Sequence, residues 1–354
     1  MGLKFGLHLM RGIPKQAVDR DNVLILGTEK LKDGGIHAKD IANTRDTCGW
    51  NGDMYGVDMT KPGAQEYYDS VFAQMAAWGL DFVKVDDLSS PYHGPEIQAI
   101  RKAIDKTGRK IVFSTSPGAT PVNQGANVQV NANQWRISGD FWDNWPALQG
   151  QFARLDQWTP YRGPGHFPDA DMLPLGRLEM WTNENGPNPG RNTRFTRDEQ
   201  FTLMNLWCIA RSPLIIGADL PHSDALTLEL LTNDEVLKVN QYSTNNRQLM
   251  HEGNAYAWVA DGEESGNKYV ALFNAPAGAA RGRGPAASTP ASAPGALTVK
   301  VPVADLKLPA TLRVTAIRDL WAHKDLPATD VISAELAPHA SAIFEVQVLP
   351  VIMK

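Results

Sequence analysis

Two adjacent carboxylates, Asp86 and Asp87, directly follow an apolar run and are the first candidates for chemistry. The run, residues 82–85, contains one charged residue, Lys84, two positions before Asp86. A buried parallel strand has this pattern, and α/β barrels carry their active sites at the C-terminal ends of such strands. Asp86 is therefore a catalytic candidate, although an aspartate after a strand often only caps the following turn.

A second carboxylate, Asp140, follows another strand-like segment, residues 134–138. Strand ends of one barrel share a mouth, so Asp86 and Asp140 are expected to face each other. Two carboxylates about 5 to 5.5 Å apart are what a retaining glycosidase needs, one as nucleophile and one as acid and then base. Arg136, beside this pair, would hold a sugar hydroxyl or tune a carboxylate.

Composition limits the possible partners. The chain has 354 residues, 43% of them hydrophobic and 21% charged, with a net charge of -5, which is typical of a globular protein. The sequence has no cluster of basic residues that would predict binding to nucleic acid or to an anionic membrane. It also has no apolar run as long as a membrane span. The two cysteines, Cys48 and Cys208, lack metal-type spacing, so we predict no metal and no organic cofactor.

The elements that must position these residues alternate between strand and helix, which is typical of a parallel α/β sheet. A polar, glycine-rich connection over residues 11–58 is unusually long for a structureless loop and is therefore expected to be functional. From residue 255 the period changes to two, which predicts an antiparallel β-sandwich. We predict a barrel domain over 1–247 and a sandwich domain over 248–354 with a low-complexity insert at 275–296. Six barrel strands are predicted, at residues 3–9, 82–85, 111–115, 134–138, 169–173 and 214–217.

The order and content of these segments resemble glycoside hydrolase family 27, which contains α-galactosidases and α-N-acetylgalactosaminidases. The resemblance covers most of the chain. It is carried by Phe82-Val-Lys-Val-Asp86, Trp135-Arg with Asp140, Pro168-Asp-Ala-Asp-Met-Leu173, Leu206-Trp with Ser212-Pro-Leu-Ile-Ile-Gly217, and Asn233-Asp-Glu-Val with Val239-Asn-Gln241. It implies a TIM (β/α)8-type barrel followed by a β-sandwich.

The resemblance also implies roles for individual residues. Asp86 matches the family's nucleophile and Asp140 its general acid/base, whereas Lys84 and Arg136 match substrate ligands. His8 stands where the family commonly places a tyrosine on the sugar. These roles are physically consistent, because a nucleophile must stay ionised beside cations and an acid must keep its proton until the leaving oxygen takes it.

Specificity at C2 of the sugar depends in the family on the loop after the next strand, here residues 114–119. Ser116 and Ala119 resemble the small residues that leave room for an N-acetyl group, although the tryptophan of that family loop is missing. Trp50 and Tyr55 in the long connection would either form a wall of the sugar site or merely anchor the loop.

Several positions depart from the family pattern. Leu88 replaces a cysteine, so Cys48 lacks the family's disulfide partner; Asp87 replaces a glycine and Pro168 an asparagine. The largest departure is that the first two of eight strands have no counterpart, and these normally carry an Asp pair and a Trp that bind galactose. We expect the sequence to be a shortened version of a longer protein; the alternative is a divergent member closed by other means.

The sequence therefore predicts a retaining exo-α-galactosidase that forms a covalent intermediate on Asp86, with a terminal α-galactoside as its partner molecule. The alternatives are an α-N-acetylgalactosaminidase that uses the same residues, and a catalytically impaired or purely carbohydrate-binding form. The sequence indicates neither the localisation nor the oligomeric state.

Overall fold

The computed structural model describes residues 2–20, 22–183, 186–264, 266–277 and 295–351. The chain forms two compact units. The first consists of Met1–Asp140 and Pro164–Asp169, and the second of Phe141–Gly163 and Ala170–Lys354. Each unit is described separately below.

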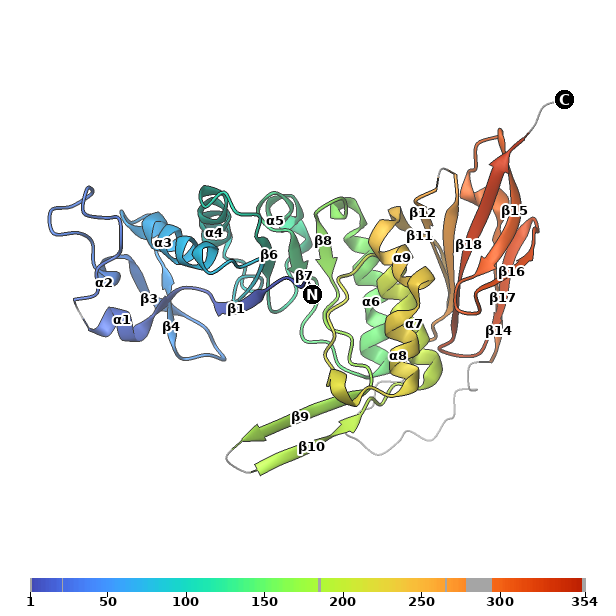
Figure 1. The fold of residues 1–354 in the computed structure, drawn as a ribbon, viewed down its shortest axis with the longest axis horizontal. Helices are drawn as coiled ribbons and strands as arrows, with labels where there is room; N and C mark the ends of the chain where they lie inside the picture. Colours follow the sequence, from blue (N-terminus) through green and yellow to red (C-terminus); the bar gives the residue numbers. More distant parts are fainter. Residues whose placement is uncertain (1, 21, 184–185, 265, 278–294, 352–354) are drawn as a thin grey trace. The chain divides into compact units, whose positions relative to one another are not determined.

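The first unit contains a five-stranded parallel sheet in the order β1-β5-β6-β7-β8 (Figure 1). Its strands are β1 (Gly6–Met10), β5 (Phe82–Asp86), β6 (Val112–Thr115), β7 (Gln134–Arg136) and β8 (Phe167–Asp169). The connecting helices are α3 (Ala64–Ala77), α4 (Gly94–Lys106) and α5 (Gly125–Asn131), the last preceded by the 3-10 turn η1 (Val122–Gln124). They follow one another as a row beside the strands (Figure 1).

Helix α4 shows why these segments fold as they do. Ile97, Ile100 and Ile104 recur at three- and four-residue spacing and are all buried, so one face of the helix packs against the sheet. The chain leaves the helix at Gly108, whose φ of +71° favours glycine. The following strand, β6, can then run parallel to β5, as predicted.

Residues 11–58, expected to be a functional connection, contain short elements of regular structure that the sequence did not predict. The segment holds β2 (Ile13–Pro14), α1 (Lys15–Asp19), α2 (Ala38–Ile41), β3 (Ala42–Thr47) and β4 (Met54–Val57). The three strands form an antiparallel sheet in the order β2-β4-β3, and Ile13, Ile25, Ile36, Ile41 and Val57 are buried. Elements of two to six residues are too short to show a hydrophobic period, which is why the pattern was missed.

The predicted strand at residues 214–217 forms only one bridge, in the second unit. Ile216 pairs in parallel with Leu173, where Leu173 N donates to Ile215 O at 2.7 Å and Gly217 N donates to Leu173 O at 3.0 Å. Pro213 cannot donate a further ladder hydrogen bond, which limits the pairing to this one point.

The rest of the α/β part of the second unit consists of four helices and a hairpin. The helices are α6 (Trp145–Gln157), α7 (Arg197–Ile209), α8 (Ala225–Thr232) and α9 (Asp234–Tyr242), with 3-10 turns η2 (Thr159–Tyr161) and η3 (Leu220–His222). The hairpin pairs β9 (Arg177–Asn183) with β10 (Gly186–Asn192). Helix α7 begins at a capping box, because Thr196 Oγ1 accepts from Glu199 N and Glu199 Oε2 accepts from Thr196 N. Among the described helices, we find none with the length and apolarity needed to cross a membrane.

The C-terminal part is an antiparallel β domain, as predicted. A six-stranded sheet in the order β11-β12-β13-β18-β15-β16 is accompanied by the pair β14-β17. The strands are β11 (Thr244–Glu252), β12 (Ala255–Asp261), β13 (Lys268–Asn274), β14 (Leu297–Pro302), β15 (Leu312–Asp319), β16 (Lys324–Pro327), β17 (Val331–Leu336) and β18 (Ser341–Pro350); η4 (Val303–Leu306) follows β14.

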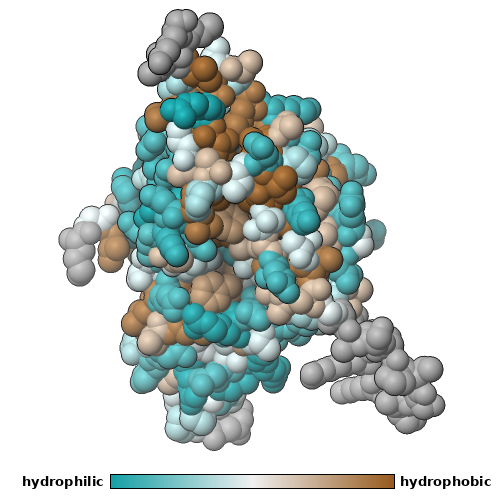
Figure 2. All heavy atoms as spheres, turned by 90° about the vertical axis from the view of Figure 1, so that its right-hand side faces the viewer, coloured by the Kyte–Doolittle hydropathy of each residue, from teal (hydrophilic) through white to brown (hydrophobic). Residues whose placement is uncertain are grey.

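A shared apolar core joins the two sheets of this domain. Val299 and Ile332 from the pair pack in one cluster with Val259, Val270 and Val346 from the larger sheet. On the outer face, hydrophobic residues lie among hydrophilic ones (Figure 2). Of the insert predicted at 275–296, residues 278–294 lie outside the described residues. The predicted domain boundary between residues 247 and 248 falls within β11, which begins at Thr244. It stays a prediction.

Candidate active site

One face of the parallel sheet carries a row of polar side chains. Pairing of the strands places His8 opposite Lys84, Lys84 opposite Ser114, and Ser114 opposite Gln134. Partners in neighbouring strands share a face, and so do residues two positions further along. Asp86, Ser116 and Arg136 are such residues and follow the row toward the C-terminal ends of the strands. The predicted site residues on these strands therefore lie on one face.

Asp86 ends β5 beside two basic side chains. His8 Nε2 lies 3.0 Å from Asp86 Oδ2, and Lys84 Nζ lies 3.6 Å from Oδ1. The aspartate side chain is 16% exposed, and among the described residues Oδ1 accepts no hydrogen bond although it is buried. Two basic side chains therefore contact the carboxylate, and Oδ1 is the oxygen that no described donor binds. The structure thus brings together three of the predicted site residues.

Arg136 ends β7 and connects two other predicted residues. Its Nη2 donates to Asp140 Oδ1 at 3.2 Å, and its Nη1 donates to Ser116 Oγ at 3.5 Å. Arg136 and Ser116 are buried, whereas the Asp140 side chain is 70% exposed. Ala119 is exposed in the loop after β6. Ser116 connects the surroundings of Asp86 with those of Arg136. Its main-chain N–H donates to Val85 O at 3.0 Å, next to Asp86, while its Oγ accepts from Arg136.

Asp169, in β8, extends the polar row and was named in the sequence only as part of a motif. Gln134 Nε2 donates to Asp169 Oδ2 at 2.8 Å, and both residues are buried. A polar residue on a buried parallel strand was the available signal, because such strands are usually apolar on both faces.

A network around Arg11, directly behind the Asp86 strand end, was missed. The guanidinium donates to Asp87 Oδ2 from Nε at 3.0 Å and from Nη2 at 2.7 Å. It also donates to both Asp46 oxygens at 2.8 and 2.9 Å and to Glu96 Oε1 at 2.7 Å. Arg11 is 2% exposed, and Tyr68 OH donates to Glu96 Oε2. The sequence signal for this network was a charged residue, Arg11, shortly after the strand predicted at residues 3–9.

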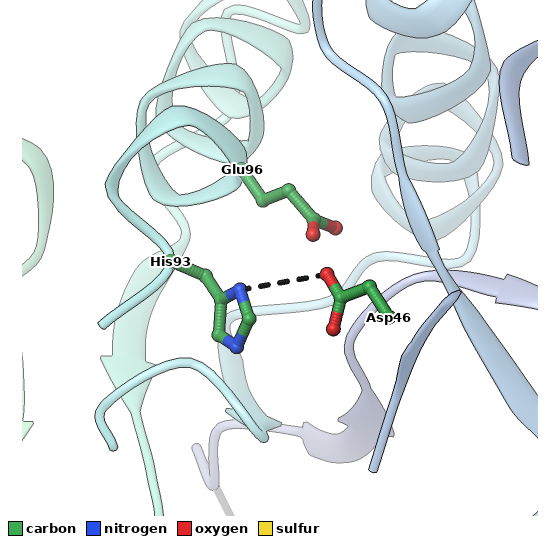
Figure 3. A group of neighbouring side chains, drawn as sticks. All are labelled: Asp46, His93 and Glu96. Atoms are coloured by element: carbon green, nitrogen blue, oxygen red, sulfur yellow. Dashed lines mark ion pairs between the residues drawn. The ribbon is translucent and has the colours of Figure 1, made fainter. Parts of the chain in front are cut away.

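Part of this network has the residue types of a metal site. Asp46 of β3, Glu96 of α4 and His93 just before α4 converge, and their ligand atoms lie within 4.8 Å of one another (Figure 3). His93 Nδ1 is 3.8 Å from Asp46 Oδ2. Because Arg11 already donates to both carboxylates and supplies the positive charge, the group is better described as an ion-pair network.

The ionisation of the network follows from burial and charge. Burial lowers the pKa of Arg11, but the carboxylates of Asp46 and Glu96 outweigh it and leave the pKa raised. Burial raises the pKa of Glu96 against the opposing effect of Arg11. Burial, followed by the charge of Arg11, lowers the pKa of His93, so the imidazole is neutral at neutral pH.

Two aromatic residues and the two cysteines remain among the features noted in the sequence. Trp50 is 56% exposed, and Lys15 Nζ lies 5.0 Å from the centre of the Tyr55 ring. Tyr55 thus has a packing partner, and its role in a sugar site stays a prediction. Cys48 and Cys208 are free and buried.

Two family models match the chain. The model described as Alpha galactosidase A matches residues 18–242, and the Alpha galactosidase C-terminal beta sandwich domain matches residues 252–346. The α-galactosidase of Oryza sativa subsp. japonica is 28% identical over 283 residues, covering 78% of this chain and 59% of the rice protein. That of Coffea arabica is 30% identical, covering 80% of this chain and 68% of the coffee protein.

Two solved structures are also similar. A GH27 β-L-arabinopyranosidase from Geobacillus stearothermophilus is 43% identical with a TM-score of 0.84, covering 100% of this chain and 75% of that chain. A putative α-N-acetylgalactosaminidase from Bacillus halodurans is 40% identical with a TM-score of 0.77, covering 98% and 75%. Together with the parallel α/β part and the antiparallel β domain, these matches confirm the predicted class, a TIM-type barrel fold with a β-sandwich.

Proposed function

We propose that this chain, which belongs to glycoside hydrolase family 27, the α-galactosidase family, is a retaining exo-glycosidase with Asp86 as its nucleophile. The observation that carries the proposal is the setting of Asp86 at the end of β5. His8 and Lys84 contact its carboxylate, and Oδ1 has no hydrogen-bond donor among the described residues. Basic neighbours and an oxygen that no donor occupies are what a carboxylate nucleophile needs.

The reaction proceeds as a double displacement. Asp86 Oδ1 attacks the anomeric carbon, the bond from that carbon to the glycosidic oxygen breaks, and Asp140 gives its proton to the leaving oxygen. Asp140, now ionised, takes a proton from water, and the water oxygen attacks the anomeric carbon and releases Asp86. The sugar leaves with its original anomeric configuration.

Arg136 supports the acid and base steps. It donates to Asp140 Oδ1 at 3.2 Å, so the proton is assigned to Oδ2. After the first step this contact stabilises the Asp140 carboxylate until water arrives. Because Asp140 is 70% exposed, it can reach both the aglycone oxygen and solvent water.

The sugar we propose first is a terminal α-linked D-galactose, the substrate class of the plant relatives. A β-L-arabinopyranoside is the second candidate, favoured by the 43% identity to the Geobacillus stearothermophilus structure. The two sugars share the ring configuration, and the arabinoside lacks the hydroxymethyl group on C5. The third, an α-N-acetylgalactosaminide, is supported by Ser116 and Ala119 and by the Bacillus halodurans structure.

Matched nitrophenyl glycosides of the three sugars separate these candidates. We expect the highest kcat/KM for α-D-galactoside. A higher value for the arabinoside or the acetamido sugar would replace the proposed substrate and keep the mechanism. Sugar binding without hydrolysis over long incubation would instead indicate a carbohydrate-binding protein.

The nucleophile is tested by Asp86→Gly. Turnover should fall by about 10³-fold or more, as for other nucleophiles that act as part of a unit. Added azide should restore it and give the glycosyl azide of inverted configuration, which NMR identifies. The control is Asp81→Asn at the opposite end of β5, where Asp81 pairs with Arg109 at 2.7 Å. Normal turnover after Asp86→Gly would rule out the assignment.

A further inference from the structure

Asp87 has an unusual backbone conformation for a side-chain-bearing residue. Its φ is +66°, in the left-handed region, and the residue is 3% exposed. Such a conformation costs about 1 kcal/mol or more outside glycine, and it persists where surrounding contacts hold it. Asp87 directly follows Asp86, so whatever holds this turn also sets the direction in which Asp86 leaves β5.

Arg11 holds the turn from two sides. Its guanidinium gives two hydrogen bonds to one oxygen of Asp87, at 2.7 and 3.0 Å. Its main-chain N–H donates to Asp86 O at 3.0 Å, directly beyond the pair Met10 and Asp86 that closes the β1–β5 register. One residue therefore fixes the carbonyl of Asp86 and the side chain of the next residue.

The guanidinium is itself fixed by three neighbouring elements. Asp46 of β3 accepts from both Nη atoms, and Glu96 of α4 accepts from Nη1 while also binding Tyr68 of α3. The β4 backbone comes close at Gly56, where a Cβ would lie 2.3 Å from Asp46 Oδ2 and 2.8 Å from Arg11 Nη1. These contacts leave the Nε edge of Arg11 directed at Asp87.

We propose that Arg11 and Asp87 are positioning residues that aim the Asp86 carboxylate at the anomeric carbon, an inference that rests on the proposed function of Asp86. Attack requires the reacting atoms to be about 3 to 3.5 Å apart and aligned, and a displacement of about 1 Å can cost 10²-fold in rate. Arg11 contacts neither sugar nor the attacking oxygen in this scheme. It acts through the peptide between residues 86 and 87.

The experiment measures formation of the covalent intermediate on the full chain. The probe is a ring-fluorinated α-D-galactosyl fluoride, whose ring fluorine slows hydrolysis of the intermediate. Asp86 Oδ1 forms the bond to the anomeric carbon, and fluoride leaves with the electron pair. Mass spectrometry locates the labelled residue. The saturating labelling rate and the probe concentration at half-saturation are recorded separately.

Asp87→Gly keeps the left-handed backbone and removes the acceptor of Arg11. We expect its saturating labelling rate to fall by about 10- to 100-fold with half-saturation within twofold, since positioning affects the bond-forming step. Asp87→Asn keeps an oxygen that can accept both Arg11 bonds, so its rate should stay within about fivefold of the parent. Gly56→Ala disturbs Arg11 and Asp46 without touching β5 and should lower the rate in the same way.

Asp81→Asn is the matched control. It removes the negative charge of a comparable pair, Arg109 Nη2 to Asp81 Oδ1 at 2.7 Å, at the other end of the same strand, and keeps an oxygen that can accept. Its labelling rate should equal that of the parent. If Asp87→Gly labels as fast as Asp81→Asn, or if both slow equally, the positioning role is refuted. If the unvaried chain acquires no label on Asp86, the proposed function fails first, and this inference fails with it.

Discussion

At the scale of the single residue, Asp140 differs from Asp86 in exposure, which fits the separate roles proposed for them. Replacing Asp140 by alanine removes the proposed proton donor and leaves the proposed nucleophile in place. Glycosides with poor leaving groups should therefore lose about 10²- to 10⁴-fold in kcat/KM, because they depend on protonation, while nitrophenyl glycosides should lose far less. A leaving-group series on both proteins checks this. An equal loss across the series would contradict the role of Asp140.

The site residues predicted from the sequence share one property: each lies in, or just after, a single strand-like segment. Lys84 and Asp86 are two residues apart, and Arg136 and Asp140 are four apart, so one segment places each pair. The partners of Arg11 are separated from it by 35, 76 and 85 residues along the chain. Their meeting depends on tertiary packing, which no local pattern encodes, and the sequence therefore indicated no partner for Asp87.

At the scale of the element, the parallel strands explain why several predicted site residues lie on one face of the sheet. Residues at the C-terminal ends of β5 and β7 must emerge at one edge of the sheet, whatever their loops do. The segment 11–58 shows the converse. Its three short strands owe their order to pairing with one another, between Ile13 and Tyr55 and between Ala42 and Val57. Pairing partners cannot be read from strands of two to six residues.

The hairpin β9–β10 is tied to the second unit by one buried carboxylate. Asp143 accepts from Arg191 Nη2 at 2.9 Å and from Arg194 N at 2.6 Å. Burial alone would raise the pKa of Asp143, but the bonds from Arg191 and Arg194 outweigh it and lower the pKa below 3.8. A depressed carboxyl pKa stabilises the fold above pH 3.8, and this stabilisation is lost as the pH falls through the folded value.

Replacing Asp143 by asparagine should therefore lower the free energy of unfolding by about 1.5 to 3 kcal/mol at neutral pH. The difference from the parent should shrink as the pH falls below 3.8 and should vanish below the lower, folded pKa of Asp143, where the parent carboxyl is neutral too. Urea unfolding at several pH values measures it. Glu179→Gln is the matched control, since it removes the exposed partner of the same arginine and should cost less. A deficit that stayed constant with pH would contradict the ion-pair explanation.

At the scale of the whole molecule, helix α7 and the β domain belong to one compact unit although the family models divide them near residue 250. Asn205 of α7 is fully buried; its Nδ2 donates to Ser341 Oγ at 2.9 Å, and Trp321 Nε1 donates to its Oδ1 at 2.8 Å. Thr202 Oγ1 donates to His339 O at 2.6 Å. Buried polar groups of the helix and of the β domain therefore find their hydrogen-bond partners in each other.

This sharing predicts that α7 and the β domain unfold together. Asn205→Leu keeps the size and leaves Trp321 Nε1 unpaired, which should cost about 1 to 3 kcal/mol, whereas Ser341 Oγ keeps its bond from Thr202 Oγ1. Hydrogen exchange should then speed up equally in α7 and β13, because one cooperative unit opens as a whole. Exposed Thr298→Ala on β14 should change stability by no more than about 0.5 kcal/mol. Faster exchange confined to α7 would show that the boundary predicted after residue 247 separates two independently stable domains.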